Sequence, residues 1–186
     1  MRINSSVQTL VAASLLMSSI GVMAAPVLSN GGTVHFKGEI VNAACSVSAD
    51  SADQTVTLGQ YRSAKFKAVG DKTGLVPFTI KLQDCDSAVS SKASVAFTGT
   101  VDAADPSVLA VSNIGGGSSG AASGVGIEIS DSQGAVLVPN GGMFSAPHKL
   151  KDGDNVLALN ARYKSTLAAV TPGAADADAT FTMQYE

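Results

Sequence analysis

The chain has 186 residues, a formal net charge of −3 and 45% hydrophobic residues, with two cysteines and no tryptophan. No basic cluster or aromatic platform accompanies this weakly acidic composition, so the sequence excludes nucleic acid as an expected partner. Helix patterns are scarce, and short strand-like runs recur between Gly, Asp, Asn and Pro residues. We therefore expect an all-β fold, with one immunoglobulin-like sandwich as the preferred architecture.

The first 24 residues have the organisation of a secretory signal peptide. Arg2 supplies a positive start, residues 10–20 are mostly apolar, and small residues precede a cleavage position after Ala24. A membrane anchor is the alternative, but the apolar run is about half of the roughly 20 residues that a spanning helix needs. We expect cleavage after Ala24, or one residue later after Ala25, and export of the remainder as a single domain.

Residues 34–40 alternate between apolar and polar side chains, as a half-buried strand does. The apolar positions are Val34, Phe36 and Ile40, and the polar positions are His35, Lys37 and Glu39. Gly38 interrupts the apolar row, and a glycine inside a strand often marks the close approach of another backbone. The stretch therefore predicts a strand that lies against a neighbouring chain segment.

Cys45 and Cys85 are the two cysteines of the chain. In an exported protein, one even pair predicts one disulfide, worth on the order of 4 kcal/mol in the chain-entropy model. Two free thiols, or half of a metal site, are the alternatives. A metal site would need further ligands. The two histidines of the chain lie far apart in the sequence and do not have the spacing of metal ligands.

Seven further runs carry the β-branched and aromatic residues of strands. They span residues 54–60, 75–85, 94–99, 125–130, 135–141, 155–165 and 178–186. The inward positions of these runs predict one core. Its expected members are Phe78, Ile80, Leu82, Val95, Phe97, Ile127, Ile129, Leu157, Leu159 and Phe181.

Two segments look irregular. Residues 112–126 are rich in Gly, Ser and Ala and predict a flexible loop, and residues 165–179 could hold a short helical turn. The loop matches G-x-S-x-G at 116–120 and G-x-G-x-x-G at 115–120. Both motifs need a strand before them and a helix directly after, and here a strand-like run follows. A plain loop is therefore the interpretation.

No other group of residues assembles an active site. His35 and His148 lie in polar surroundings and are expected to be solvated. The acidic pairs fall in turn-like sequence, where solvated turn acids are the expectation and a weak calcium site lacks a full ligand set. These pairs are Asp152 with Asp154 and Asp176 with Asp178. We expect no catalytic residue, no metal, no cofactor and no small-molecule substrate.

The last run of the sequence ends at the final residue, Glu186. Phe181, Met183 and Tyr185 alternate with polar residues, so this run predicts a strand with one apolar face. We expect no later segment to cover it. An uncovered apolar strand edge invites pairing with another chain.

The two ends of the sequence resemble a known family. Residues 30–47 (NGGTVHFKGEIVNAACSV), 82–86 (LQDCD) and 171–186 (TPGAADADATFTMQYE) are similar to the major structural subunit of type 1 fimbriae, a rod pilin of the chaperone–usher pathway in Gram-negative bacteria. The resemblance implies an incomplete immunoglobulin-like sandwich that is completed by a donor strand from another subunit. It also implies three parts: a signal peptide (1–24), an N-terminal donor extension (25–44) and a pilin domain (45–186).

The resemblance assigns roles to individual residues. Val34, Phe36, Gly38 and Ile40 match the donor strand, with Gly38 facing a shallow part of the acceptor groove. Cys45 and Cys85 match the family disulfide. The acceptor groove and chaperone contact are matched by Gly173, Phe181, Met183, Tyr185 and Glu186.

The implied function is a fimbrial rod subunit that supports cell adhesion. The implied partners are identical subunits, a periplasmic chaperone, an outer-membrane usher and minor tip subunits, on a path through the periplasm to the cell surface. Three alternatives remain: a minor adaptor pilin of the same pathway, a small secreted binding module, and a secreted enzyme. A tip adhesin would carry an extra N-terminal domain for which the chain is too short.

Overall fold

The computed structural model describes residues 27–116 and 120–186. The expected signal peptide and its cleavage positions lie outside the described residues. The chain divides into two compact units, residues 1–39 and 40–186. The described part of the first unit, residues 27–39, contains no helix or strand, so the strand expected at residues 34–40 is not formed within it.

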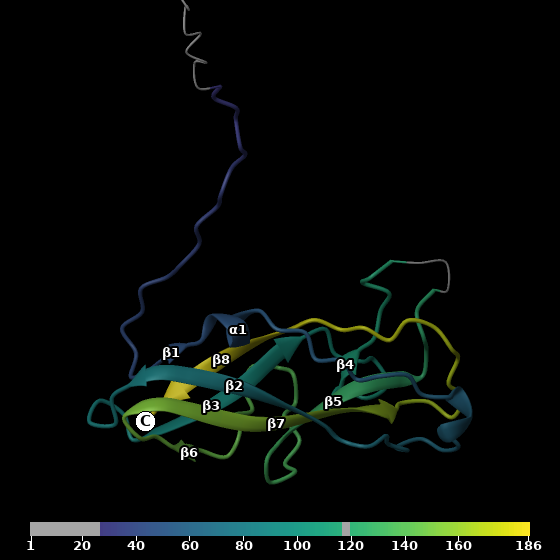
Figure 1. Cartoon of the computed structure of the whole chain (residues 1–186). Coiled ribbons are helices and arrows are strands. Elements are labelled where there is room, and N and C mark those ends of the chain that lie inside the picture. Colours follow the sequence, from purple (N-terminus) through teal and green to yellow (C-terminus); the bar gives the residue numbers. More distant parts are fainter. Residues whose placement is uncertain (1–26, 117–119) are drawn as a thin grey trace, which may run out of the picture. The chain divides into compact units, whose positions relative to one another are not determined.

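The second unit is a β-sandwich of two antiparallel sheets (Figure 1). The five-stranded sheet has the order β1-β2-β7-β5-β4, and the three-stranded sheet has the order β6-β3-β8. The strands of the first sheet are β1 (Ser46–Val47), β2 (Val76–Cys85), β7 (Gly153–Ser165), β5 (Val125–Asp131) and β4 (Leu109–Ala110). Those of the second are β6 (His148–Lys149), β3 (Lys92–Gly99) and β8 (Ala179–Tyr185). The expected all-β sandwich is therefore confirmed.

The core lies between the two sheets and follows the expected alternation. On β2, Ile80 and Leu82 are fully buried while Lys81 between them is exposed. The ring of Phe78 on β2 meets the ring of Phe97 on β3 edge-on, with centroids 6.2 Å apart, so the two sheets are in direct contact. Each fully buried aliphatic or aromatic side chain of this kind contributes roughly 1.5–3 kcal/mol.

Eight of the ten expected core residues are buried. These are Ile80, Leu82, Val95, Phe97, Ile127, Ile129, Leu157 and Leu159. The other two, Phe78 and Phe181, are partly buried and pack against the same cluster. The cluster is thus less closed on the side of Phe181, on β8, than at its centre.

The disulfide between Cys45 and Cys85 is confirmed. Both cysteines are buried, and they join the residue before β1 to the last residue of β2. The bond therefore anchors the first residues of the sandwich to one of its central strands.

Two expected strands are wrong. Residues 54–60 form no strand, although Val56 and Leu58 keep the expected alternation and are partly buried. A strand needs a ladder of backbone hydrogen bonds. This segment is instead connected to β2 by a side-chain hydrogen bond, in which Gln54 Nε2 donates to the carbonyl oxygen of Thr79 at 3.2 Å.

Residues 135–141 form no strand because they change sheets. The amide of Leu137 donates to the carbonyl of Ile129 on β5, while the amide of Gly141 donates to the carbonyl of Phe97 on β3. The segment therefore leaves one sheet for the other before a ladder can form. The helical turn suggested for residues 165–179 is also absent; the short helices are α1 (Ala49–Ala52) and η1 (Ser63–Lys65) instead.

A cluster of charged side chains lies on β5 and β7, on the face of the five-stranded sheet that is turned away from the core. Glu128 on β5 is 1% exposed and forms two ion pairs. Its Oε1 lies 2.6 Å from Arg162 Nη2, and its Oε2 lies 2.9 Å from Lys72 Nζ. Lys164 Nζ lies 2.7 Å from Asp105 on the adjoining loop. Burial alone would raise the pKa of Glu128, but the hydrogen bonds from Lys72 and Arg162 together outweigh it and hold the pKa below its usual value. The cluster ties two loops to β5 and β7.

Glu128→Gln should destabilise the domain by about 2 kcal/mol, because two cations would lose their shared carboxylate. Since the pKa of Glu128 is lowered from 4.5, its contribution is present above pH 4.5 and is lost as the pH falls through the lowered value. Urea unfolding at pH 7 and at lower pH measures both effects. Asp50→Asn is the control, because it breaks an ion pair with Lys81 in which both side chains are more than half exposed, and its urea midpoint should not change. Equal midpoints for Glu128→Gln and the parent chain would contradict the assignment.

Candidate functional site

The last strand, β8, has a partner on one side. It pairs with β3 in an antiparallel register that runs from Gly99 opposite Ala179 to Ala93 opposite Tyr185. Within residues 27–116 and 120–186, no strand pairs with its opposite edge (Figure 1). The free edge of β8 therefore presents backbone groups that a further strand could bond.

The hydrogen-bond phase shows which residues of β8 present those groups. The amide of Lys92 donates to the carbonyl of Glu186 at 2.9 Å, and the amide of Glu186 donates back at 3.0 Å. Antiparallel partners exchange such bonds at every second residue. The even-numbered residues of β8 thus face β3, and residues 181, 183 and 185 direct their amides and carbonyls to the free edge.

The opposite side of β3 supports the same phase. The carbonyl of Val95 accepts from the amide of Ser145 at 2.8 Å, and the carbonyl of Phe97 accepts from the amide of Gly141 at 2.8 Å. The odd-numbered residues of β3 therefore bond away from β8, as the alternation requires.

The same odd-numbered residues of β8 carry its apolar side chains. Phe181, Met183 and Tyr185 are partly buried and pack against the core, whereas Thr180 and Thr182 are exposed. Residues 181, 183 and 185 thus direct apolar side chains to the core and backbone amides and carbonyls to the free edge of the sheet. A strand laid along this edge would gain hydrogen bonds and would cover core side chains that are now partly exposed.

Tyr185 connects the last strand to the start of the sandwich. Its hydroxyl donates to the carbonyl of Cys45 at 3.3 Å, and burial raises the pKa of this phenol, so the donor proton is retained at neutral pH. The disulfide fixes Cys45 in turn to β2. One end of the free edge is therefore held against the first residues of the second unit.

Glu186 follows β8 directly and continues its pairing with β3. Its carbonyl also accepts from the amide of Ser91 at 2.8 Å, and its side-chain Oε1 accepts from Gln184 Nε2 at 2.9 Å. Residue 186 is thereby placed at the start of β3.

Gly173 lies before β8 and packs closely against its own chain. A Cβ at this position would lie 2.5 Å from backbone atoms of both Ala121 and Ala122. The amide of Ala122 also donates to the carbonyl of Ala174 at 2.7 Å. Gly173 thus allows the segment that leads into β8 to lie directly on the loop before β5.

The same segment lines a cavity of about 480 Å³. Tyr61 and Tyr163 wall it with their rings edge-on at 5.9 Å, and Tyr163 donates its hydroxyl to the carbonyl of Ala175 at 2.9 Å. Burial raises the pKa of Tyr163, and the nearby carboxylate of Asp176 adds to this effect. No local pattern in the sequence indicates this aromatic pair, because its members are far apart along the chain.

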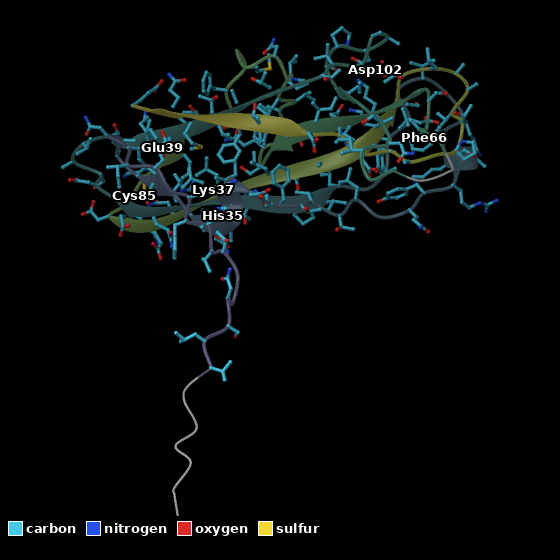
Figure 2. All side chains as sticks on the ribbon, turned by 90° about the horizontal axis from the view of Figure 1, so that it is seen from above. His35, Lys37, Glu39, Phe66, Cys85 and Asp102 are labelled. Atoms are coloured by element: carbon cyan, nitrogen blue, oxygen red, sulfur yellow. A yellow bond between two sulfur atoms is a disulfide. The ribbon has the colours of Figure 1, made fainter. Side chains whose placement is uncertain are left out.

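The expected donor residues are solvent-exposed. Phe36 is 93% exposed, Ile40 is 100% exposed and Val34 is 74% exposed. Figure 2 labels the polar residues His35, Lys37 and Glu39, which alternate with them along the chain. Gly38 has no left-handed backbone conformation, and within its own segment a Cβ would meet nothing. The local conformation therefore does not explain why this position is glycine.

Two of the residues weighed for other chemistry, His148 and Asp152, have structural partners. His148 belongs to β6 and pairs with Ala93, and Asp152 accepts hydrogen bonds from Ser87, which lower the pKa of its carboxyl group. The glycine loop leads from Gly120 into β5 rather than into a helix. Among the described residues, no three His, Cys, Asp or Glu side chains gather as metal ligands. No helix in that part of the chain has the length and apolar character needed to span a bilayer.

Comparison with known proteins decides the family. The model of the fimbrial protein family matches residues 34–186. The chain belongs to the fimbrial protein family. It is 54% identical over 177 residues to the fimbrial subunit type 1 of Salmonella typhimurium, covering 94% of this chain and 95% of that protein. It is 50% identical to the type-1 fimbrial protein A chain of Escherichia coli, covering 95% of each.

Solved pilus subunits share this fimbrial fold. A chain from a chaperone–usher pilus matches with a TM-score of 0.68 and 30% identity, covering 88% of this chain and all of that one. The P pilus rod subunit PapA matches with a TM-score of 0.63 and 30% identity, covering 77% of this chain and all of that one. The expected incomplete immunoglobulin-like sandwich is therefore confirmed. The protein is a structural subunit of an extracellular pilus of Gram-negative bacteria, assembled with other pilin subunits.

Gly173→Ala should destabilise the domain by about 2 kcal/mol, because the added methyl group would force two backbone segments apart. Thermal unfolding followed by circular dichroism measures the loss. Gly74→Ala is the matched control, since a Cβ there meets nothing within 4 Å and its backbone is not left-handed. A Gly173→Ala protein as stable as the Gly74→Ala protein would show that the close contact is not required.

Proposed function

We propose that this subunit polymerises by donor-strand exchange, in which the extension of one copy (residues 25–44) binds the free edge of β8 in another. The observation that carries the proposal is that edge itself. Phe181, Met183 and Tyr185 turn apolar side chains inward and backbone groups outward, and no described strand uses those groups. Strand addition is the recognition mode that matches such an edge.

The extension has the complementary pattern. Val34, Phe36 and Ile40 share one face of an extended chain, with Gly38 between the last two, so this face can cover the half-open core while the backbone bonds β8. Burying Phe36 and Ile40, which are now almost fully exposed, contributes roughly 1.5–3 kcal/mol each. Each backbone hydrogen bond adds about 0.5–1.5 kcal/mol.

Gly38 fits a position where the neighbouring backbone leaves no room for a side chain. Neither its conformation nor the contacts within its own segment require glycine. A requirement imposed by the partner accounts for its place in the apolar row.

This interface joins two different surfaces of the same protein. A heterologous contact that does not close on itself generates a filament rather than a ring. We propose further that the chain is exported through the periplasm, where a chaperone covers the free edge and contacts Glu186 until an outer-membrane usher delivers the subunit to the fibre. Minor tip subunits complete the fibre, which serves cell adhesion. Neither a cofactor nor catalysis is part of this proposal.

Gly38→Phe should abolish polymerisation, because the ring would meet the backbone of the acceptor subunit. Size exclusion with light scattering and electron microscopy of secreted fibres measure assembly, and co-purification measures chaperone binding, which should be nearly unchanged. Lys37→Phe is the matched control: the same ring on the opposite face should still allow fibres. Normal fibres from the Gly38→Phe protein would overturn the proposed register.

A further inference from the structure

Met183 occupies the centre of the free edge. It lies opposite Val95 on β3, and Phe181 and Tyr185 flank it on the same face of β8. Its side chain packs against the core but remains partly exposed. The other methionine of the described residues, Met143, is 44% exposed in the loop between β5 and β6.

The surroundings of Met183 are apolar. Val95 is fully buried, Phe97 is 5% exposed, and the rings of Phe97 and Phe181 lie 6.3 Å apart. The backbone amide and carbonyl of residue 183 face the free edge of β8. The thioether is therefore part of the surface that a donor strand covers and from which it excludes water.

We propose that Met183 is an oxidation site that controls strand acceptance. Hydrogen peroxide or hypochlorous acid transfers one oxygen atom to the sulfur: the thioether loses two electrons and becomes a sulfoxide, and the oxidant is reduced to water, or to chloride with release of a proton. The sulfoxide is polar and chiral where the thioether was apolar and flexible. This inference rests on the proposed strand exchange and adds a means of regulating it.

The sulfoxide oxygen weakens binding because it is a strong hydrogen-bond acceptor. While the edge is free, water can satisfy this oxygen. A bound donor strand removes the water; the donor amides that face β8 are already used in pairing with its backbone, and the alternate amides point away from β8. Burying an acceptor without a partner costs binding free energy.

Protection should depend on assembly. In a subunit whose edge is covered, the donor strand shields the thioether, so the same oxidant reaches it more slowly. Oxidants would therefore stop the addition of subunits whose edge is uncovered, while sparing fibres already formed.

The test treats the full exported chain with hydrogen peroxide before or after assembly and quantifies both sulfoxides by peptide mass spectrometry. Light scattering then measures polymer growth, and circular dichroism checks that the oxidised protein remains folded. We expect about a tenfold slower growth after oxidation of free subunits. In polymers, we expect Met183 to be spared while Met143 is oxidised.

Two variants separate the sulfurs. Met183→Leu keeps the volume and lacks sulfur, so its growth should be unchanged by oxidant. Met143→Leu should lose growth as the parent chain does. The proposal is overturned if Met183→Leu is inhibited equally, or if the folded parent chain assembles normally with Met183 fully oxidised. Failure of the untreated parent chain to assemble would instead count against strand exchange itself.

Discussion

Every strand in an antiparallel sheet has two sets of backbone groups, and β8 uses one of them. Its even-numbered residues bond β3, while residues 181, 183 and 185 turn theirs to an edge that no described strand occupies. The side chains of that second set also close one side of the core incompletely. Backbone pairing and core closure are thus missing at the same place, so a single added strand would supply both.

Two sets of contacts stabilise the sandwich beside this open side and on the opposite sheet. The disulfide anchors Cys45 to β2, and Tyr185 donates to the carbonyl of Cys45, which joins the last strand to the first residues of the unit. In the five-stranded sheet, Glu128 forms ion pairs with Arg162 on β7 and with Lys72 on a loop. Because Tyr185 belongs to the free edge, its hydrogen bond to Cys45 also fixes one end of that edge.

Local pattern predicted much of this structure. Alternation identified the long strands and eight buried core residues, and the final run identified Phe181, Met183 and Tyr185 as one face of an end strand. Residues 54–60 show why pattern alone falls short: they alternate correctly, yet no neighbouring backbone gives them a ladder. The Glu128 cluster and the Gly173 contact depend on registers between distant segments, which no local pattern contains.

The most direct test is size exclusion with light scattering on residues 25–186 and on residues 45–186, the latter with and without a peptide of residues 33–43 (TVHFKGEIVNA). The account predicts polymers from the longer chain. It predicts monomers from the shorter chain, which the peptide binds and stabilises against heat. Equal mass and equal thermal stability of the two chains, with no effect of the peptide, would contradict the claim that the β8 edge accepts the extension.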